Sequence, residues 1–340
     1  MLIVGCGYIG TALAERLARS AEVLAVTSSD KRHSRLKSIG AKPIVADVQT
    51  KRWHSDLPAS VDVVVNSISS GGRDYRATYW ESNYDLLEKY SREPPKHFIY
   101  TSSTSVYSQT DGSVVTEQDE AEPSSPMREI LAETEQMLLN DKNLPSIAIL
   151  RLGGIYGPGR HALLDDLREG VRSFPEDPNR WINQIHRNDV VSAILHVLKL
   201  EPKREIYNVV DDEAIAYGTC LKWLAKQLKV EPPVFDPEAS AQRTRPGPKP
   251  HRRISNAKLK STGWSPKYPS FREGFAQIFQ EEREVRSQKS EVRSLAPAAS
   301  NSEWLLGPRS DPCNPRPPPH ASENTSATSR WPARRSCAGR

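Results

Sequence analysis

The sequence contains few cysteines, no long apolar run and no recognisable leader. Its four cysteines are too few and too widely spaced for a disulfide framework or a metal cluster, so no metal site is expected. No apolar run approaches the roughly 20 residues that a membrane helix needs. The first apolar stretch is only long enough for a strand and runs into glycines, so no signal peptide is predicted. We therefore expect a cytoplasmic protein that does not associate with a membrane.

Excess charge is also missing from most of the chain. Residues 283–340 carry ten Lys or Arg and five Asp or Glu, so their net charge of +5 equals the formal net charge of the whole chain. Residues 1–282 are therefore neutral, and no nucleic-acid partner is expected for them. The segment 283–340 is rich in Pro, Ser and Arg and has too little apolar surface for a core, which predicts a disordered tail. We favour a dispensable extension over a tether to nucleic acid or a membrane.

Three glycines follow the first apolar segment at the spacing G-x-G-x-x-G. The first ten residues read MLIVGCGYIG, in which Leu2–Val4 are the apolar segment, and an amphipathic helix is predicted after the glycines. Between a strand and a helix, such glycines allow a tight turn, close approach of main-chain N–H groups to a diphosphate, and close packing of the helix. The turn is predicted to bind a dinucleotide, and a tight turn that binds nothing is the alternative. The predicted contacts are Gly5, Gly7, Tyr8, Ile9 and Gly10.

Short apolar segments alternate with amphipathic ones up to residue 152. Further strands are predicted at residues 22–27, 44–47, 61–66, 98–102 and 146–152, and helices at residues 31–39, 75–90 and 127–140. This alternation predicts an α/β fold with a doubly wound parallel sheet of the Rossmann type. Ligands bind at the carboxyl ends of such strands, so Asp47 and Ser67 are candidate cofactor contacts. Asp47 would accept a hydrogen bond from the adenine amino group or serve only as a turn residue.

Beyond residue 159 the pattern is less regular. Helices are predicted at residues 162–171, 188–200, 217–228 and from about 270, and strands at residues 181–186 and 206–210. We assign residues 1–160 to a dinucleotide-binding domain. Residues 161–282 are predicted to form a small C-terminal cap, interleaved with the sheet, that closes over the strand ends.

The residues after the second strand bear on the choice between NAD and NADP. NAD-preferring sheets place an Asp or Glu there to bind the ribose 2′-OH, but residues 27–32 read TSSDKR. Hydroxyls and cations suit a 2′-phosphate, so we predict contacts from Ser28 and Arg32 and a preference for NADP, with NAD as the second choice. Asp30 turning inward would reverse this preference. A solvated helix start is the alternative role for Arg32.

Five segments carry a resemblance to a known family. They are GCGYIG at 5–10, ADV at 46–48, TSSTSVY at 101–107, LRLGGIYGPG at 150–159 and IHRNDVV at 185–191. Together they resemble the extended short-chain dehydrogenase/reductases, usually named NAD-dependent epimerase/dehydratases. The resemblance implies a Rossmann-type fold, a nicotinamide cofactor and a small-molecule substrate held between the sheet and the cap. It also implies a homodimer formed through helices 75–90 and 127–140.

The family's catalytic Tyr and Lys are missing from this chain. In the family they are spaced Y-x-x-x-K on the helix after the TSSTSVY segment, and a Glu commonly follows four residues after the Lys. With Glu135 as that Glu, Met127 stands at the Tyr position and Leu131 at the Lys position. No Tyr occurs from Ser108 to Leu150, so a register error does not restore the pair. The chain therefore resembles an atypical branch that keeps the nucleotide site.

Other side chains at the strand ends are candidates for chemistry. The resemblance places Ser103 at the family's catalytic Ser/Thr, where its hydroxyl would bind a substrate oxygen, and Tyr107 is a phenol that would supply a proton. Arg151 is predicted to pair with a substrate anion, and Gly157 and Gly159 to form a fixed loop over the nicotinamide. Each has a purely structural alternative. Ser103 would then be a loop hydroxyl that satisfies main chain, and Tyr107 a packing residue. Arg151 would support the sheet, and the two glycines would form a simple turn.

Two functions fit these features. The first is an NAD(P)-binding, epimerase/dehydratase-like oxidoreductase that acts on a small polar substrate such as a nucleotide-linked sugar. The second is a catalytically silent NAD(P)-binding sensor or scaffold. The missing Tyr and Lys favour the second function, whereas the retained TSSTSVY and GPG segments favour the first.

Overall fold

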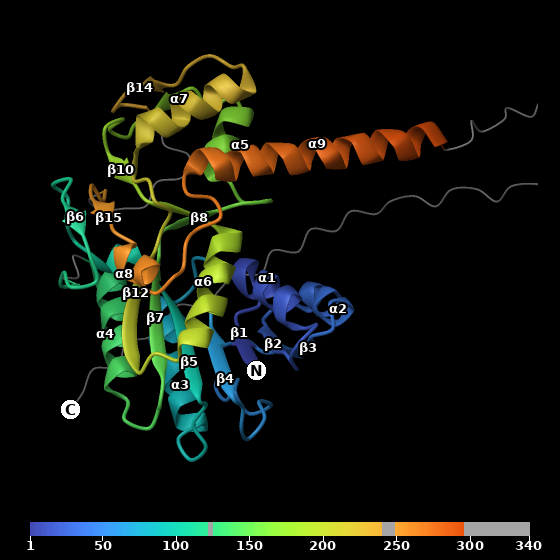
Figure 1. Cartoon of the computed structure of the whole chain (residues 1–340), viewed down its shortest axis with the longest axis vertical. Helices are drawn as coiled ribbons and strands as arrows, with labels where there is room; N and C mark the ends of the chain where they lie inside the picture. The colour runs from blue at the N-terminus through green and yellow to red at the C-terminus, as the bar shows by residue number, and fades with distance from the viewer. Residues whose placement is uncertain (122–124, 240–248, 296–340) are drawn as a thin grey trace, which may run out of the picture. The chain divides into compact units, whose positions relative to one another are not determined.

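Seven parallel strands form one sheet (Figure 1). The structure is a computed structural model that describes residues 1–121, 125–239 and 249–295. The strands lie in the order β12-β7-β5-β4-β1-β2-β3, which confirms the predicted doubly wound sheet of Rossmann type. Their bounds are β1 (Leu2–Val4), β2 (Leu24–Thr27), β3 (Lys42–Val45), β4 (Val63–Asn66), β5 (His97–Ser103), β7 (Ile147–Leu152) and β12 (Arg204–Val209).

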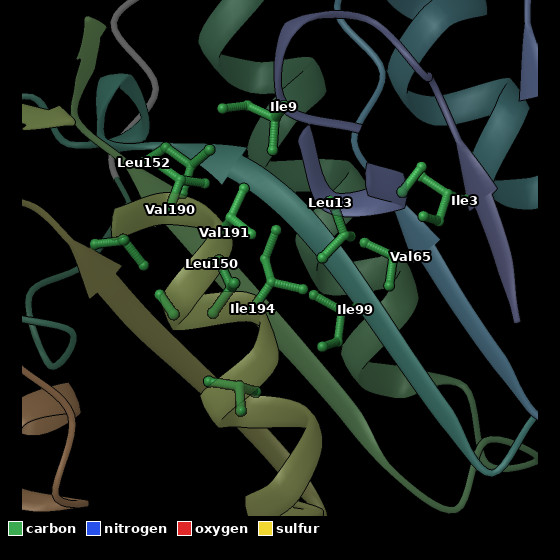
Figure 2. Close-up of a cluster of buried hydrophobic side chains, with 14 of the residues drawn as sticks. Ile3, Ile9, Leu13, Val65, Ile99, Leu150, Leu152, Val190, Val191 and Ile194 are labelled. Carbon is green, nitrogen blue, oxygen red and sulfur yellow. The ribbon is translucent and has the colours of Figure 1, made fainter. Parts of the chain in front are cut away.

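Helices cover both faces of this sheet. Successive residues of a strand point to opposite sides, and because both sides are apolar here, each face is covered by its own layer of helices. Ile3 joins one apolar layer, and its neighbours Leu2 and Val4 join the other. Figure 2 shows the first layer, in which side chains of α1 and α6 gather against the strands. The first layer contains α1 (Tyr8–Leu17), α2 (Asp30–Ser38) and α6 (Arg187–Leu200), and the second contains α3 (Ser82–Lys89) and α4 (Pro126–Asn140).

The cap has an apolar cluster of its own. Leu164 of α5, Leu221 of α7 and Phe275 of α9 are buried together in it. Its helices are α5 (Ala162–Arg168), α7 (Tyr217–Leu228) and the first turns of α9 (Phe271–Leu295). Short strand pairs and one short helix complete the fold: β8 (Gly154–Tyr156) with β11 (Gln184–His186), β10 (Trp181–Ile182) with β13 (Ile215–Ala216), β9 (Ser173–Phe174) with β14 (Val234–Phe235), β6 (Val114–Val115) with β15 (Arg253–Ile254), and α8 (Ala257–Ser261).

Three predicted elements differ from the structure. The helix predicted at 75–90 opens with a π-helical turn, Arg76–Glu81, before α3 begins. The strand predicted at 181–186 is two short strands, because Asn183 interrupts it: its carbonyl accepts from Gly154 N–H, and its side chain accepts from Ile254 N–H. Helix α9 does not end at residue 282 but continues to Leu295.

The longer α9 has a simple physical origin. Its first turns are anchored by buried Phe271 and Phe275, so the costly nucleation step is already complete. Its following residues are mostly good helix formers, which extend the helix without a core. The remainder of the predicted tail, residues 296–340, lies outside the described residues. Within the described part, no helix combines the length and apolar character that crossing a membrane requires.

Candidate active site

The glycine turn has the shape that the sequence predicts. Gly5 has a φ of +87°, and a Cβ there would lie 2.6 Å from the main chain of Ile68. A Cβ on Gly10 would lie 2.5 Å from the Gly5 carbonyl oxygen, so this glycine is needed for α1 to approach the strand. A Cβ on Gly7 would meet nothing closer than 3.9 Å. The space in front of Gly7 is therefore open to a ligand.

The amino end of α1 is available to an anion. The helix begins at Tyr8, and no side chain caps it at Gly7. The first amides of a helix have no partner inside the helix and carry partial positive charge. Together with the open space at Gly7, these amides form a cradle that fits a diphosphate.

A cleft of about 960 Å³ lies at the carboxyl ends of the strands, and both the sheet and the cap line it. The structure brings together most of the predicted cofactor contacts in this cleft, along with one of the two predicted catalytic residues. The predicted residues that line it are Gly5, Gly7, Tyr8, Ile9, Ser28, Arg32, Ser67 and Ser103.

Six other predicted residues do not line the cleft, namely Gly10, Asp47, Tyr107, Arg151, Gly157 and Gly159. The Asp47 carboxylate accepts hydrogen bonds from Arg73 Nη1 at 2.7 Å and from the Gln49 amide at 3.1 Å, so it has partners within the protein. Gly157 lies behind Tyr8, and a Cβ on it would be 2.8 Å from the Tyr8 hydroxyl. That hydroxyl donates to the Pro158 carbonyl at 3.1 Å, which joins the glycine turn to the cap loop.

Arg151 belongs to a buried network. Its guanidinium donates to both carboxylate oxygens of Glu135, with Nη2–Oε2 at 2.6 Å and Nε–Oε1 at 3.2 Å. The two side chains are only 5% and 4% exposed. Ser102 donates to the same carboxylate at 2.5 Å. This pair ties β7 to α4, which is the supporting role that the sequence left open for Arg151.

The two predicted catalytic residues have different surroundings. Ser103 lines the cleft, and its Oγ accepts from the Ser105 amide at 3.1 Å, which leaves its own proton available to a substrate oxygen. Tyr107 is fully buried and donates to Asn208 Oδ1 at 2.9 Å. Burial raises the pKa of the Tyr107 phenol. The geometry therefore favours Ser103 over Tyr107 as a group that contacts substrate.

Helix α4 presents one of the two replaced catalytic positions to the cleft. Leu131 lines the cleft, and Met127, one turn earlier, is 42% exposed and does not line it. Neither side chain can exchange a proton. The buried Glu135 lies one turn beyond Leu131 on the same helix.

Several residues that line the cleft were missed by the sequence analysis. Tyr79, in the π-helical turn, accepts from the Ser70 amide at 3.3 Å and packs against Tyr75 with 4.8 Å between ring centroids. The missed cations, Arg73, Arg160, Arg180 and Arg252, all come from loops, where no motif marks them. Among the described residues, the cleft is lined by five arginines (Arg32, Arg73, Arg160, Arg180, Arg252) and two acids (Asp166, Glu176), so its lining is positive and suits anionic ligands.

A buried histidine beneath the cleft makes stability depend on pH. His186 Nδ1 accepts from the Asn188 amide at 3.3 Å, and burial lowers the pKa of the ring to about 4 from 6.5. The folded state therefore keeps the ring neutral while the unfolded state protonates it. The free energy of unfolding should fall as the pH drops from 6.5 to 4, by at most about 3 kcal/mol from this group.

Urea titrations at several pH values check this dependence. His186→Asn keeps an acceptor for the Asn188 amide and removes the titrating ring, so the variant should lose less stability between pH 6.5 and pH 4 than the wild type. Equal pH profiles for the two proteins would contradict the expectation.

Comparison with known proteins agrees with the geometry. A model of the NAD dependent epimerase/dehydratase family matches residues 1–210. Protein YeeZ of Escherichia coli K12 is 30% identical over 246 residues, which cover 68% of this chain and 85% of YeeZ.

Two solved structures share the fold at low sequence identity. A dTDP-glucose 4,6-dehydratase of Streptomyces venezuelae, solved with NAD, has a TM-score of 0.69 at 20% identity and covers 84% of this chain and 98% of its own. A UDP-glucose 4-epimerase of Thermotoga maritima, solved with UDP-glucose, has a TM-score of 0.68 at 19% identity and covers 83% of this chain and 98% of its own. The fold, the glycine turn and the match to the family model lead to one conclusion: the chain belongs to the NAD-dependent epimerase/dehydratase family.

Proposed function

We propose that this protein is an NADP-dependent oxidoreductase of the epimerase/dehydratase type that acts on a small polar substrate such as a nucleotide-linked sugar. The observation that carries the proposal is the glycine turn, which packs tightly at Gly5 and Gly10 and stays open at Gly7. It lies in a positively lined cleft that also contains the Ser103 hydroxyl. A nicotinamide cofactor would supply the hydride transfer at this site.

The protein's own residues would bind and orient the reactants. The amides at the start of α1 would bind the diphosphate, and Ser67, whose hydroxyl donates to the Gly5 carbonyl at 3.2 Å, lines the same cleft beside the glycine turn. Ser103 would donate its free hydroxyl proton to the carbonyl or alcohol oxygen of the substrate and hold it in position. Leu131 lines the cleft and would present an apolar surface to the bound reactants.

The preference for NADP rests on Arg32. Its side chain lines the cleft and, among the described residues, forms no ion pair with a carboxylate. Asp30 is exposed and is not part of the lining. This arrangement supports binding of a 2′-phosphate over binding of a free 2′-OH.

Arg32→Ala should weaken NADPH binding by about tenfold or more and leave NADH binding nearly unchanged, because only NADPH carries the 2′-phosphate. Thermal shifts over a range of concentrations of each cofactor measure both affinities. Lys31→Ala is the matched control, since Lys31 is exposed and lies outside the lining. Equal loss for both cofactors, or tighter binding of NAD by the wild type, would count against NADP.

A second function, a silent NAD(P)-binding sensor or scaffold, is favoured by one observation: Leu131 presents an aliphatic chain to the cleft where the family has Lys. Restoring both groups separates the two functions. Met127→Tyr with Leu131→Lys should raise NADPH consumption with a panel of carbonyl compounds if the pocket is catalytic. Met127→Phe with Leu131→Met is the control without titratable groups. Because Met127 lies outside the lining, unchanged consumption would favour the sensor only where cofactor binding is intact and a crystal structure of the variant shows the new phenol in the cleft.

A further inference from the structure

Arg252 is a buried cation that has no acidic partner among the described residues. It directly precedes β15, lines the cleft and is only 3% exposed. Its Nη2 donates to the Thr104 carbonyl at 2.7 Å and its Nη1 to the Gln109 carbonyl at 3.3 Å. Its Nε is buried and, within residues 1–121, 125–239 and 249–295, has no hydrogen-bond partner. The guanidinium therefore keeps unused donors, since it has five N–H groups in all.

Arg151 shows, by contrast, how a buried arginine in this protein is paired with an acidic residue. Both arginines are buried, but Arg151 has the Glu135 carboxylate at 2.6 Å, whereas the partners of Arg252 in the part of the chain that the structure describes are neutral carbonyl groups. Removing a charge from water without an opposite charge costs several kcal/mol. Burial and the nearby Arg128 cation lower the pKa of Arg252 to about 10. An anion placed beside Arg252 would stabilise its positive charge and so offset both the cost of burial and the repulsion from Arg128.

The main chain around Arg252 is fixed in position. Asn183 Nδ2 donates to the Arg252 carbonyl at 3.0 Å, and Asn183 Oδ1 accepts from the Ile254 amide at 2.7 Å. The carbonyl that Arg252 holds belongs to Thr104, the residue after Ser103. The cation is thus preorganised next to the residue that follows Ser103, in the part of the cleft where Ser103 would hold the substrate oxygen.

We propose that Arg252 binds an oxyanion of the substrate, a carboxylate or a phosphate, beside the Ser103 hydroxyl. The proposal rests on the proposed function, because it assigns the substrate end of the same cleft. The free Nε and a second guanidinium N–H would donate to the two oxygens of the anion. The substrate is then a small polar compound that carries a negative charge close to its reacting oxygen.

Anion binding to the full chain tests this assignment. The protein, first saturated with NADPH so that the glycine turn is filled, is titrated calorimetrically with inorganic phosphate and, separately, with malonate. Arg252→Gln should weaken binding of the preferred anion by about tenfold or more. The matched control is Arg253→Gln, because the exposed Arg253 is the next residue and donates to Gly112 outside the cleft. It should change the affinity by less than about twofold.

The outcomes are distinguishable. Equal anion affinity for the wild type and Arg252→Gln, even with a lower Tm for the variant, would show that Arg252 only holds the Thr104 and Gln109 carbonyls and would overturn the proposal. If NADPH does not bind, the proposed function fails, and titration of the protein alone still tests Arg252. If the variant does not fold, a selenate soak of wild-type crystals should give anomalous density beside the guanidinium. Density only elsewhere would also overturn the proposal.

Discussion

Gly7→Ala is expected to lower the affinity for NADPH about 100-fold and to change the free energy of unfolding by no more than about 1 kcal/mol. A Cβ at residue 7 meets no protein atom closer than 3.9 Å, so the free protein has room for it. The same methyl group would lie where the diphosphate approaches the amides of α1. Loss of two charge-assisted hydrogen bonds accounts for a change of this size. Calorimetric titration with NADPH and urea unfolding measure the two quantities.

Gly10→Ala provides the comparison. Its Cβ would lie 2.5 Å from the Gly5 carbonyl oxygen, so α1 must shift away from the strand and both stability and cofactor affinity should fall. If Gly7→Ala bound NADPH as well as the wild type, the turn would not hold a diphosphate and the proposed function would be lost with it.

Glu135→Gln is expected to lower the free energy of unfolding by about 3 kcal/mol or more. The substitution keeps the shape of the side chain but leaves the Arg151 cation buried and unpaired, and breaking a buried pair in this way costs roughly 3–5 kcal/mol. Urea unfolding measures the loss.

Glu22→Gln is the control for Glu135→Gln, because it breaks an exposed pair of similar length: Lys42 Nζ and Glu22 Oε1 are 2.6 Å apart. It should give no measurable change, since exposed pairs contribute little. A negligible effect of Glu135→Gln would contradict the supporting role of the Arg151–Glu135 pair.

The sequence predicted the architecture well because local patterns determine it. Strands β1, β5 and β7 come from short apolar segments that are buried on both faces of the sheet, and the apolar residues of α6 recur at helical spacing and pack against it. The glycine turn was equally predictable, because the G-x-G-x-x-G spacing lies within residues 5–10, even though the main chain that Gly5 approaches belongs to the distant Ile68. These features can be recognised from a pattern within one short stretch of sequence.

The substrate end of the cleft was not predictable for the opposite reason. Arg252 touches Thr104, which is 148 residues away in the chain, and no spacing rule reports such a contact. The sequence allowed a substrate anion as the partner of Arg151 but did not identify Glu135 as its partner. That pairing depends on how α4 packs against β7. The π-helical turn that places Tyr79 in the cleft also has no sequence pattern that marks it.

The path of the chain limits how this protein can acquire a new substrate. After β7 the chain leaves the sheet for the cap, returns through α6 and β12, and leaves again for α7. Strand β12 pairs with β7 along its whole length, and α6 covers one face of the sheet. The later half of the chain therefore supplies both an edge strand and a covering helix of the sheet. Recombination at one junction cannot therefore exchange the cap as a module. Substitutions in the loops and short strands that line the cleft are the simpler route to a new specificity.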